Sequence, residues 1–129
     1  MTARDVLEDA KDSLLYCMEL SERLEVYRTI AERAKRRGYD EAALELVEKG
    51  EELRGELAIM RQRADIANAL IALLGDAKLQ TVLRLIYICG MPMKEAAQKM
   101  HYTLRNAYKL HSKALALLET HFTNGGTNE

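Results

Sequence analysis

Residues 92–118, PMKEAAQKMHYTLRNAYKLHSKALALL, decide the fold of the C-terminal part of this chain. A short helical segment around Ala97 is followed by a turn at His101, and Thr103 then offers a hydroxyl that can cap the free N–H groups of a second helix. A side chain as small as that of Ala97 allows the second helix to cross the first closely. The spacing therefore predicts two helices joined by a sharp turn.

The second helix is expected to carry one apolar face and one polar, basic face. Its apolar residues recur at three- and four-residue steps, which at about 100° per residue form a single stripe. The stripe consists of Ala107, Leu110, Ala114, Leu117 and Leu118. The candidate DNA-binding residues on the turn and the outer side of this helix are Thr103, Arg105, Asn106, Tyr108, Lys109, Ser112 and Lys113.

Polar and basic side chains of this kind suit phosphate oxygens and base edges. A basic outer face is more often only the solvated side of an amphipathic helix, so the preceding helix and turn decide between the two interpretations. Two helices joined at a steep angle by a few residues are what a helix-turn-helix requires in order to place its second helix in the major groove.

Residues 84–118 resemble region four, the C-terminal promoter-reading domain of bacterial sigma factors. They are more similar still to small phage and prophage proteins, described as transcriptional regulators, that carry this domain behind a helical N-terminal half. The shared features are the aliphatic and Tyr run 83–88, Gly90 before a short loop, Ala97, Tyr102-Thr103 at the turn, Tyr108-Lys109-Leu110-His111 and Lys113-Ala114-Leu115.

The resemblance implies a sequence-specific regulator, phage or prophage derived, that binds double-stranded DNA and modulates transcription initiation without melting DNA. The N-terminal half would contact RNA polymerase or a second copy of the chain. The groove or backbone contacts that the resemblance implies are Thr103, Arg105, Asn106, Tyr108 and Lys109, with Lys113 toward phosphate.

Three residues depart from the family pattern. His101 occupies a turn position where the family usually has Gly, so a positive φ there would carry some strain. Ala107 replaces a β-branched core residue, which predicts a more loosely seated second helix. Leu104 stands where sigma factors typically have a basic residue, so their base readout does not transfer directly.

Composition predicts an all-α protein. The 129 residues include one Pro, no Trp and one Phe, and the aromatic and β-branched runs that strands favour are missing. Residues 1–77 contain 12 basic and 17 acidic residues, net −5, whereas residues 78–129 contain 7 basic and 3 acidic residues, net +4. The positive charge thus lies in the half that carries the DNA-binding pattern.

Two heptad-like seams predict a long antiparallel helical hairpin in the N-terminal half. The first seam is Ala3, Val6, Ala10, Ser13, Cys17, Leu20, Leu24, Tyr27, Ala31 and Ala34; the second is Ala43, Leu46, Gly50, Leu53, Leu57, Met60, Ala64, Ala67, Ile71 and Leu74. Between them, Gly38 is expected as a C-cap and Asp40 as an N-cap. Facing residues should sum to 77, which places Gly50 opposite the ring of Tyr27.

The expected organisation is a coiled-coil-like hairpin over residues 1–74, a region-four-like helix-turn-helix domain over 76–121 and a disordered tail over 122–129. The seam thins toward the open end of the hairpin, so another segment should cover that end. The apolar helix expected over residues 77–89 is the natural candidate, and dimerisation is the alternative.

Cys17 and Cys89 lie among apolar neighbours without metal-like pairing, which predicts buried thiols in a reducing cytoplasm. No leader-like segment and no apolar run near 20 residues is present, so neither secretion nor membrane insertion is expected. No carboxylate or thiol accompanies the three histidines, and no polar constellation suggests catalysis. We therefore expect no enzymatic activity, no cofactor and no bound metal.

One alternative function stays open at this point. A helical oligomerising protein, such as a phage assembly or packaging subunit, would use the same coiled-coil pattern with nonspecific or no DNA binding. Preference for one duplex at physiological salt separates the two functions, because a nonspecific binder loses nearly all its affinity as salt rises.

Overall fold

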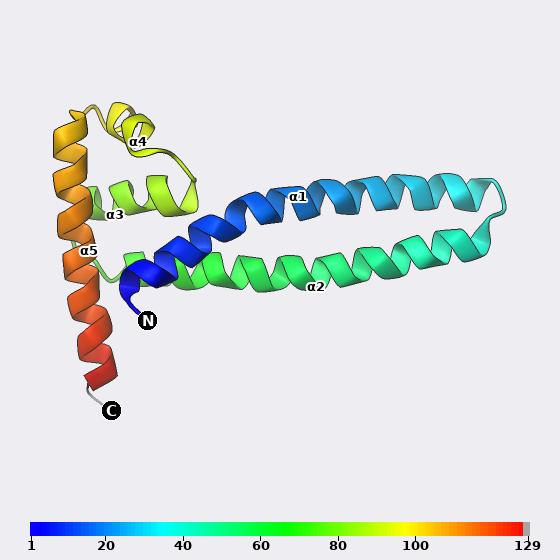
Figure 1. Cartoon of the computed structure of the whole chain (residues 1–129), viewed down its shortest axis with the longest axis horizontal. Helices are drawn as coiled ribbons and strands as arrows, with labels where there is room; N and C mark the ends of the chain where they lie inside the picture. Colours follow the sequence, from blue (N-terminus) through cyan, green and yellow to red (C-terminus); the bar gives the residue numbers. More distant parts are fainter. Residues whose placement is uncertain (128–129) are drawn as a thin grey trace. The chain divides into compact units, whose positions relative to one another are not determined.

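The structure, a computed structural model, describes residues 1–127, and this part of the chain is all-α as predicted (Figure 1). The elements are α1 (Ala3–Arg36), α2 (Asp40–Ile71), α3 (Ala77–Leu83), a π-helical segment η1 (Arg84–Ile88), α4 (Met93–Lys99) and α5 (Leu104–Thr127). The long antiparallel pair α1–α2 precedes the shorter helices, which pack together. None of the helices in residues 1–127 has both the length and the apolarity that crossing a bilayer requires.

The chain forms two compact units that do not coincide with the predicted domains. The arm unit comprises residues 15–62, and the head unit comprises residues 1–14 together with residues 63–127. The predicted boundary near residue 75 thus falls inside the head unit. The reason is that the first turns of α1 and the last turns of α2 contribute to the same apolar core as α3 and α5.

The arm unit is held by the two predicted seams. Along both seams the residues within 15–62 are buried or half-buried, and Leu20, Leu53 and Leu57 form the centre of its core. Cys17, Leu24 and Tyr27 pack against this centre. The periodicity of three and four residues therefore identified the contact face of each helix correctly.

Gly50 differs from its predicted role. A Cβ at Gly50 would lie 3.2 Å from Cδ1 of Leu24, so the side chain that occupies this space belongs to Leu24 and not to Tyr27. At the hairpin turn, Gly38 adopts φ +85° as expected for a C-cap glycine. The N-cap prediction is one residue off, because α2 already begins at Asp40 and the carbonyl of Tyr39 accepts from Ala43 N at 3.0 Å.

The head unit has the larger core. Its fully buried large side chains are Leu7, Ile71, Val82, Leu83 and Leu118, which come from α1, α2, α3 and α5. This core covers the open end of the hairpin, as the apolar character of residues 77–89 predicts. At the chain terminus, the backbone N–H of Ala3 donates to Glu119 at 2.7 Å. The head unit is thus built from segments distant in sequence.

The predicted helix over residues 77–89 changes type within its length. Asp76 caps α3 by accepting from Lys78 N at 2.8 Å and Leu79 N at 3.2 Å. After Leu83 the backbone widens into η1, and Cys89 N donates to the carbonyl of Arg84 in an i→i+5 bond. Cys89, the residue that follows η1, is exposed, so its predicted burial is wrong.

The segment predicted as a disordered tail, residues 122–129, differs over most of its length. Helix α5 continues to Thr127, and Phe122 is partly buried against the head core. The periodicity of α5 places Phe122 on the same side as Leu118, four residues earlier, which is why it finds apolar neighbours. Residues 128–129 lie outside the described part of the chain.

Candidate nucleic-acid interface

A sharp corner connects α4 to α5. The N–H of Tyr102 donates to the carbonyl of Ala97 at 2.9 Å, and the N–H of His101 donates to that of Gln98 at 3.1 Å. These two bonds form a Schellman motif, whose C′ residue takes a left-handed backbone. His101 has φ +60° and is the one non-glycine residue with positive φ in residues 1–127. The turn predicted at His101 is therefore present, with the strain that its side chain implies.

The beginning of α5 is capped as predicted. Oγ1 of Thr103 accepts from Asn106 N at 3.1 Å, and the carbonyl of Thr103 accepts from Ala107 N at 3.0 Å. The hydroxyl of Thr103 thereby satisfies one of the N–H groups at the helix start and fixes the direction in which α5 leaves the corner.

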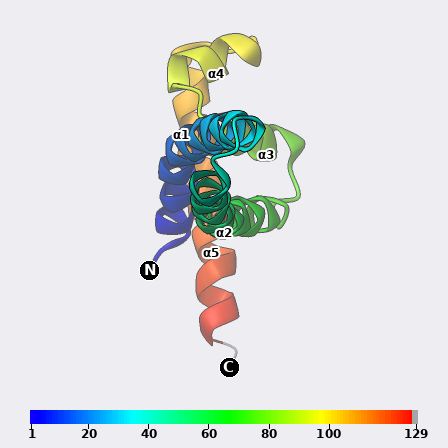
Figure 2. The same ribbon diagram turned by 90° about the vertical axis from the view of Figure 1, so that its right-hand side faces the viewer.

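The inner face of α5 packs against the rest of the head unit. Ala107, Ala114 and Leu118 are fully buried, and Leu110 is half-buried. Leu117 is exposed, so its predicted place on the buried stripe is wrong. The buried residues of α4, Ala96 and Ala97, have side chains small enough for the close crossing that the sequence predicts. Helix α4 lies beside the first turns of α5 in both views (Figures 1 and 2).

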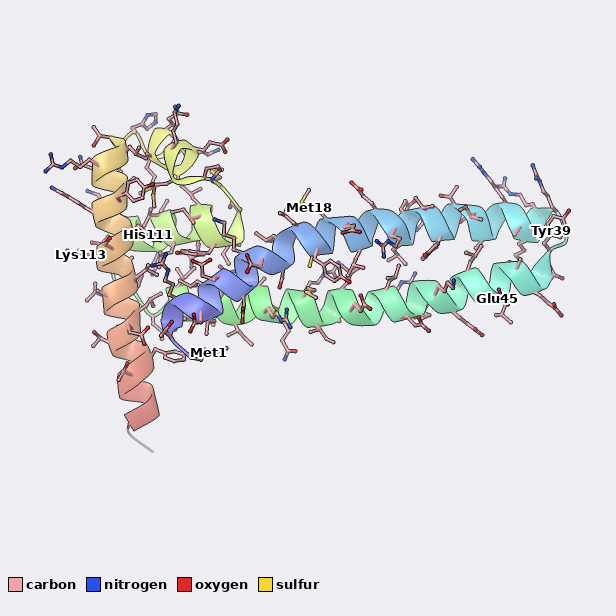
Figure 3. The ribbon with its side chains drawn as sticks, viewed as in Figure 1. Met1, Met18, Tyr39, Glu45, His111 and Lys113 are labelled. Carbon is pink, nitrogen blue, oxygen red and sulfur yellow. The ribbon has the colours of Figure 1, made fainter. Side chains whose placement is uncertain are left out.

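The outer face of α5 carries the predicted site residues. All seven are exposed to solvent: Thr103, Arg105, Asn106, Tyr108, Lys109, Ser112 and Lys113. The structure thus brings them together on the corner and the first three turns of one helix. Lys113 lies on the side of α5 opposite His111, which faces α3 (Figure 3).

The charge of this surface is positive. Between residues 94 and 113 the chain has five basic residues and one acidic residue, Glu95. Arg105, Lys109 and Lys113 form no ion pair within residues 1–127, whereas α1 and α2 contain ion pairs between residues three or four positions apart. The positive charge of α5 is therefore not neutralised by neighbouring carboxylates.

Two apolar side chains interrupt the polar surface at one flank. Leu104 and Tyr108 are both exposed and lie four residues apart, so they are neighbours on the helix surface. Leu104 was identified from the sequence as a departure from the sigma-factor pattern. Its exposure shows that it is available to a ligand rather than part of the core.

Sequence reasoning missed a contact that fixes α5 from behind. The hydroxyl of Tyr87 in η1 and Nε2 of His111 in α5 are 2.7 Å apart, and their rings stack with centroids 5.7 Å apart. Burial, assisted by the positive charge of Arg4, lowers the pKa of His111, while burial and the carboxylate of Glu8 raise the pKa of Tyr87. Both groups are thereby favoured in their neutral forms.

The three histidines do not assemble into a metal site. Within the part of the chain that the structure describes, no three His, Cys, Asp or Glu side chains gather in a way that could hold a metal ion. His111 is engaged by Tyr87 instead.

Comparison with known proteins identifies the family of the chain. No curated protein and no solved structure matches it. The model of a family of unknown function, DUF1492, matches residues 14–119, which include most of α1, all of α2, α3, η1 and α4, and the exposed surface of α5. The chain therefore belongs to the DUF1492 family.

Proposed function

We propose that this protein is a sequence-specific DNA-binding regulator that modulates transcription initiation, with α4 and α5 as its DNA-binding elements. The observation that carries the proposal is the exposed, positively charged outer face of α5 directly after the corner at His101. A helix that begins at a sharp corner and has its outer side free is the arrangement that enters a major groove.

The dimensions support this mode of binding. Residues 104–113 form the first three turns of α5, about 15 Å of helix at 1.5 Å per residue, and the major groove is about 12 Å wide. In this arrangement Arg105 would donate to a guanine edge and Asn106 would pair with an adenine. Lys109 and Lys113 would contact phosphates, which add affinity without sequence preference.

The cap of α5 supplies further contacts. Thr103 Oγ1 accepts from Asn106 N, which leaves its hydroxyl proton free to donate to a phosphate oxygen. The N–H groups of the first turn and the helix dipole favour an anion at the same place. Leu104 and Tyr108 offer apolar surface that suits a thymine methyl group.

The resemblance of residues 84–118 to region four of sigma factors supports the regulatory part of the proposal. It favours a phage or prophage regulator that acts at promoters and contacts RNA polymerase. Belonging to DUF1492 is compatible with this role and does not identify it.

The decisive experiment is selection of bound duplexes from a random pool, followed by binding measurements at several salt concentrations. We expect one preferred duplex that is bound at least about a thousandfold more tightly than competitor DNA at physiological salt. Equal affinity for all duplexes, lost steeply as salt rises, would contradict sequence-specific regulation and favour the assembly function instead.

Two variants separate base contacts from phosphate contacts. Arg105→Ala should weaken binding to the selected duplex by about 1–3 kcal/mol and relax its preference, whereas Lys113→Ala should weaken all duplexes alike and lower the salt slope by about 1. Arg61→Ala and Lys49→Ala are matched controls, because they remove the same charges from exposed positions on α2. Identical behaviour of the Arg105 and Lys113 variants on every sequence would remove the base-reading role of Arg105.

A further inference from the structure

Two large apolar side chains lie exposed on the candidate nucleic-acid interface. Leu104 and Tyr108 are 45% and 52% exposed, and neither belongs to the core of the head unit. They lie one turn apart at the beginning of α5, and at about 100° per residue their directions around the helix differ by about 40°. Together they form one apolar surface, which we call the apolar flank.

The position of the apolar flank distinguishes it from ordinary protein surface. Scattered exposed apolar residues are normal on a folded protein. The other exposed residues in the first three turns of α5, however, are all polar or basic: Arg105, Asn106, Lys109, Ser112 and Lys113. Leu117, the next exposed large apolar residue of α5, lies about 20 Å further along the helix. The apolar flank is therefore confined to the part of α5 that a helix-turn-helix brings to the bases.

One feature of the base edges in the major groove is apolar. Thymine presents its C5 methyl group there, whereas the other edge groups that distinguish the bases donate or accept hydrogen bonds. Base pairs follow one another about every 3.4 Å along the duplex, and Leu104 and Tyr108 are about 6 Å apart along the helix axis. The apolar flank is thus long enough to cover methyl groups at one or two neighbouring base pairs.

We propose that the apolar flank binds the C5 methyl group of a pyrimidine, so that the preferred duplex carries a thymine at or next to the base pair that Arg105 contacts. This inference rests on the proposed function, because it requires α5 to lie in the major groove. The ligand is defined by one chemical group: 5-methylcytosine presents the same methyl, and deoxyuridine lacks it. Leu104 stands where sigma factors typically have a basic residue, so the inferred preference comes from a position at which this chain departs from their pattern.

The neighbouring charges favour this contact. Arg105 directly follows Leu104, and Lys109 directly follows Tyr108, so each apolar side chain lies beside an exposed cation. Contacts of the two cations with phosphate or guanine would hold α5 in the groove, and the apolar flank would then add discrimination between bases. Removal of one methyl group from water is worth about fourfold in affinity.

Single deoxyuridine substitutions test the methyl contact on the wild-type protein. Each thymine of the duplex selected from the random pool is replaced in turn by deoxyuridine, which removes the methyl group and keeps the base pair. We expect the affinity to fall about fourfold at one or two positions and to stay unchanged at the others. At such a position, 5-methylcytosine should be bound about fourfold more tightly than cytosine. Equal affinity for every deoxyuridine-containing duplex, or a selected duplex without thymine, would overturn the proposal.

Variants of the apolar flank assign the contact to its residues. The double variant Leu104→Ser/Tyr108→Ser should bind the thymine and deoxyuridine duplexes equally at the sensitive positions. Leu117→Ser is the matched control, because Leu117 is a similarly exposed leucine on the same helix, at 41%, and this variant should keep the fourfold difference. A double variant that kept the full difference would show that other residues read the methyl group, and the proposal would be wrong.

The outcomes also separate this inference from the proposed function. If no duplex is preferred over competitor DNA, both are contradicted. If one duplex is preferred but its affinity does not depend on any methyl group, only the apolar flank loses its assigned role, and sequence-specific binding through α5 stands.

Discussion

Replacing His101 by glycine should stabilise the protein, because the corner between α4 and α5 forces this residue into a left-handed backbone. His101 has φ +60° at the C′ position of α4, and Gly38 occupies the same position after α1 with φ +85°. The side chain of His101 is exposed, so its removal sacrifices little packing. The two turns have the same hydrogen-bond pattern and differ in whether the left-handed residue carries a Cβ.

The magnitude follows from two opposing terms. A left-handed conformation costs a residue with a Cβ about 1–2 kcal/mol, and a glycine costs about 0.5–1 kcal/mol more entropy when the chain folds. The net gain for His101→Gly is therefore about 0.5–1 kcal/mol. For a domain of this size, the melting temperature should rise by about 2–5 °C.

Urea unfolding followed by circular dichroism measures this difference, with two control variants. His101→Ala keeps the Cβ and should give no gain. Gly38→Ala should lose about 1 kcal/mol, and because nothing lies within 4 Å of a Cβ at Gly38, this loss would come from the backbone alone. If His101→Gly were less stable than wild type while Gly38→Ala behaved as expected, the left-handed corner at residue 101 would be wrong.

Three further predictions concern packing and titration. Leu20→Ala should lower the free energy of unfolding by about 2–3 kcal/mol, because Leu20 is fully buried in the arm core, and urea unfolding would show it. Gly50→Ala should gain about 0.5 kcal/mol in the same assay, since the helix propensity of Ala outweighs the displacement of half-buried Leu24; a loss would mean that Leu24 cannot move. Burial and the charge of Arg4 lower the pKa of His111, so near pH 6 the unfolded chain binds more protons than the folded chain does. The free energy of unfolding should therefore fall as the pH drops below about 6.5, by at most about 1.4 kcal/mol per pH unit. His111→Gln should flatten this slope in unfolding measurements between pH 7.5 and 5.5.

The helices and their contact faces could be predicted from sequence because they depend on local periodicity. The seams through Leu20 and Leu57 and the cap at Thr103 are examples. The boundary between the compact units could not be predicted, since the heptad pattern of α2 continues through it without interruption. Within α2 the arm unit ends at residue 62 and the head unit resumes at residue 63, and the apolar spacing on the two sides of this boundary is the same.

The candidate site was predictable on its solvent side and not on its inner side. Exposure of Arg105 and Lys109 follows from the amphipathic pattern of α5 alone. The contact between Tyr87 and His111 joins two residues 24 positions apart, so the pattern of apolar residues along one helix does not predict it.

The discontinuous make-up of the head unit has a consequence for its biosynthesis. Ala3, Leu7 and Ala10 are translated well before the residues of α3 and α5 among which they are buried. The head can therefore complete its core only after α5 has been made. A fragment that starts at Ala77 would lack the side chains that α1 and α2 contribute to this core, so a shortened version that keeps α4 and α5 folded has to retain those segments as well.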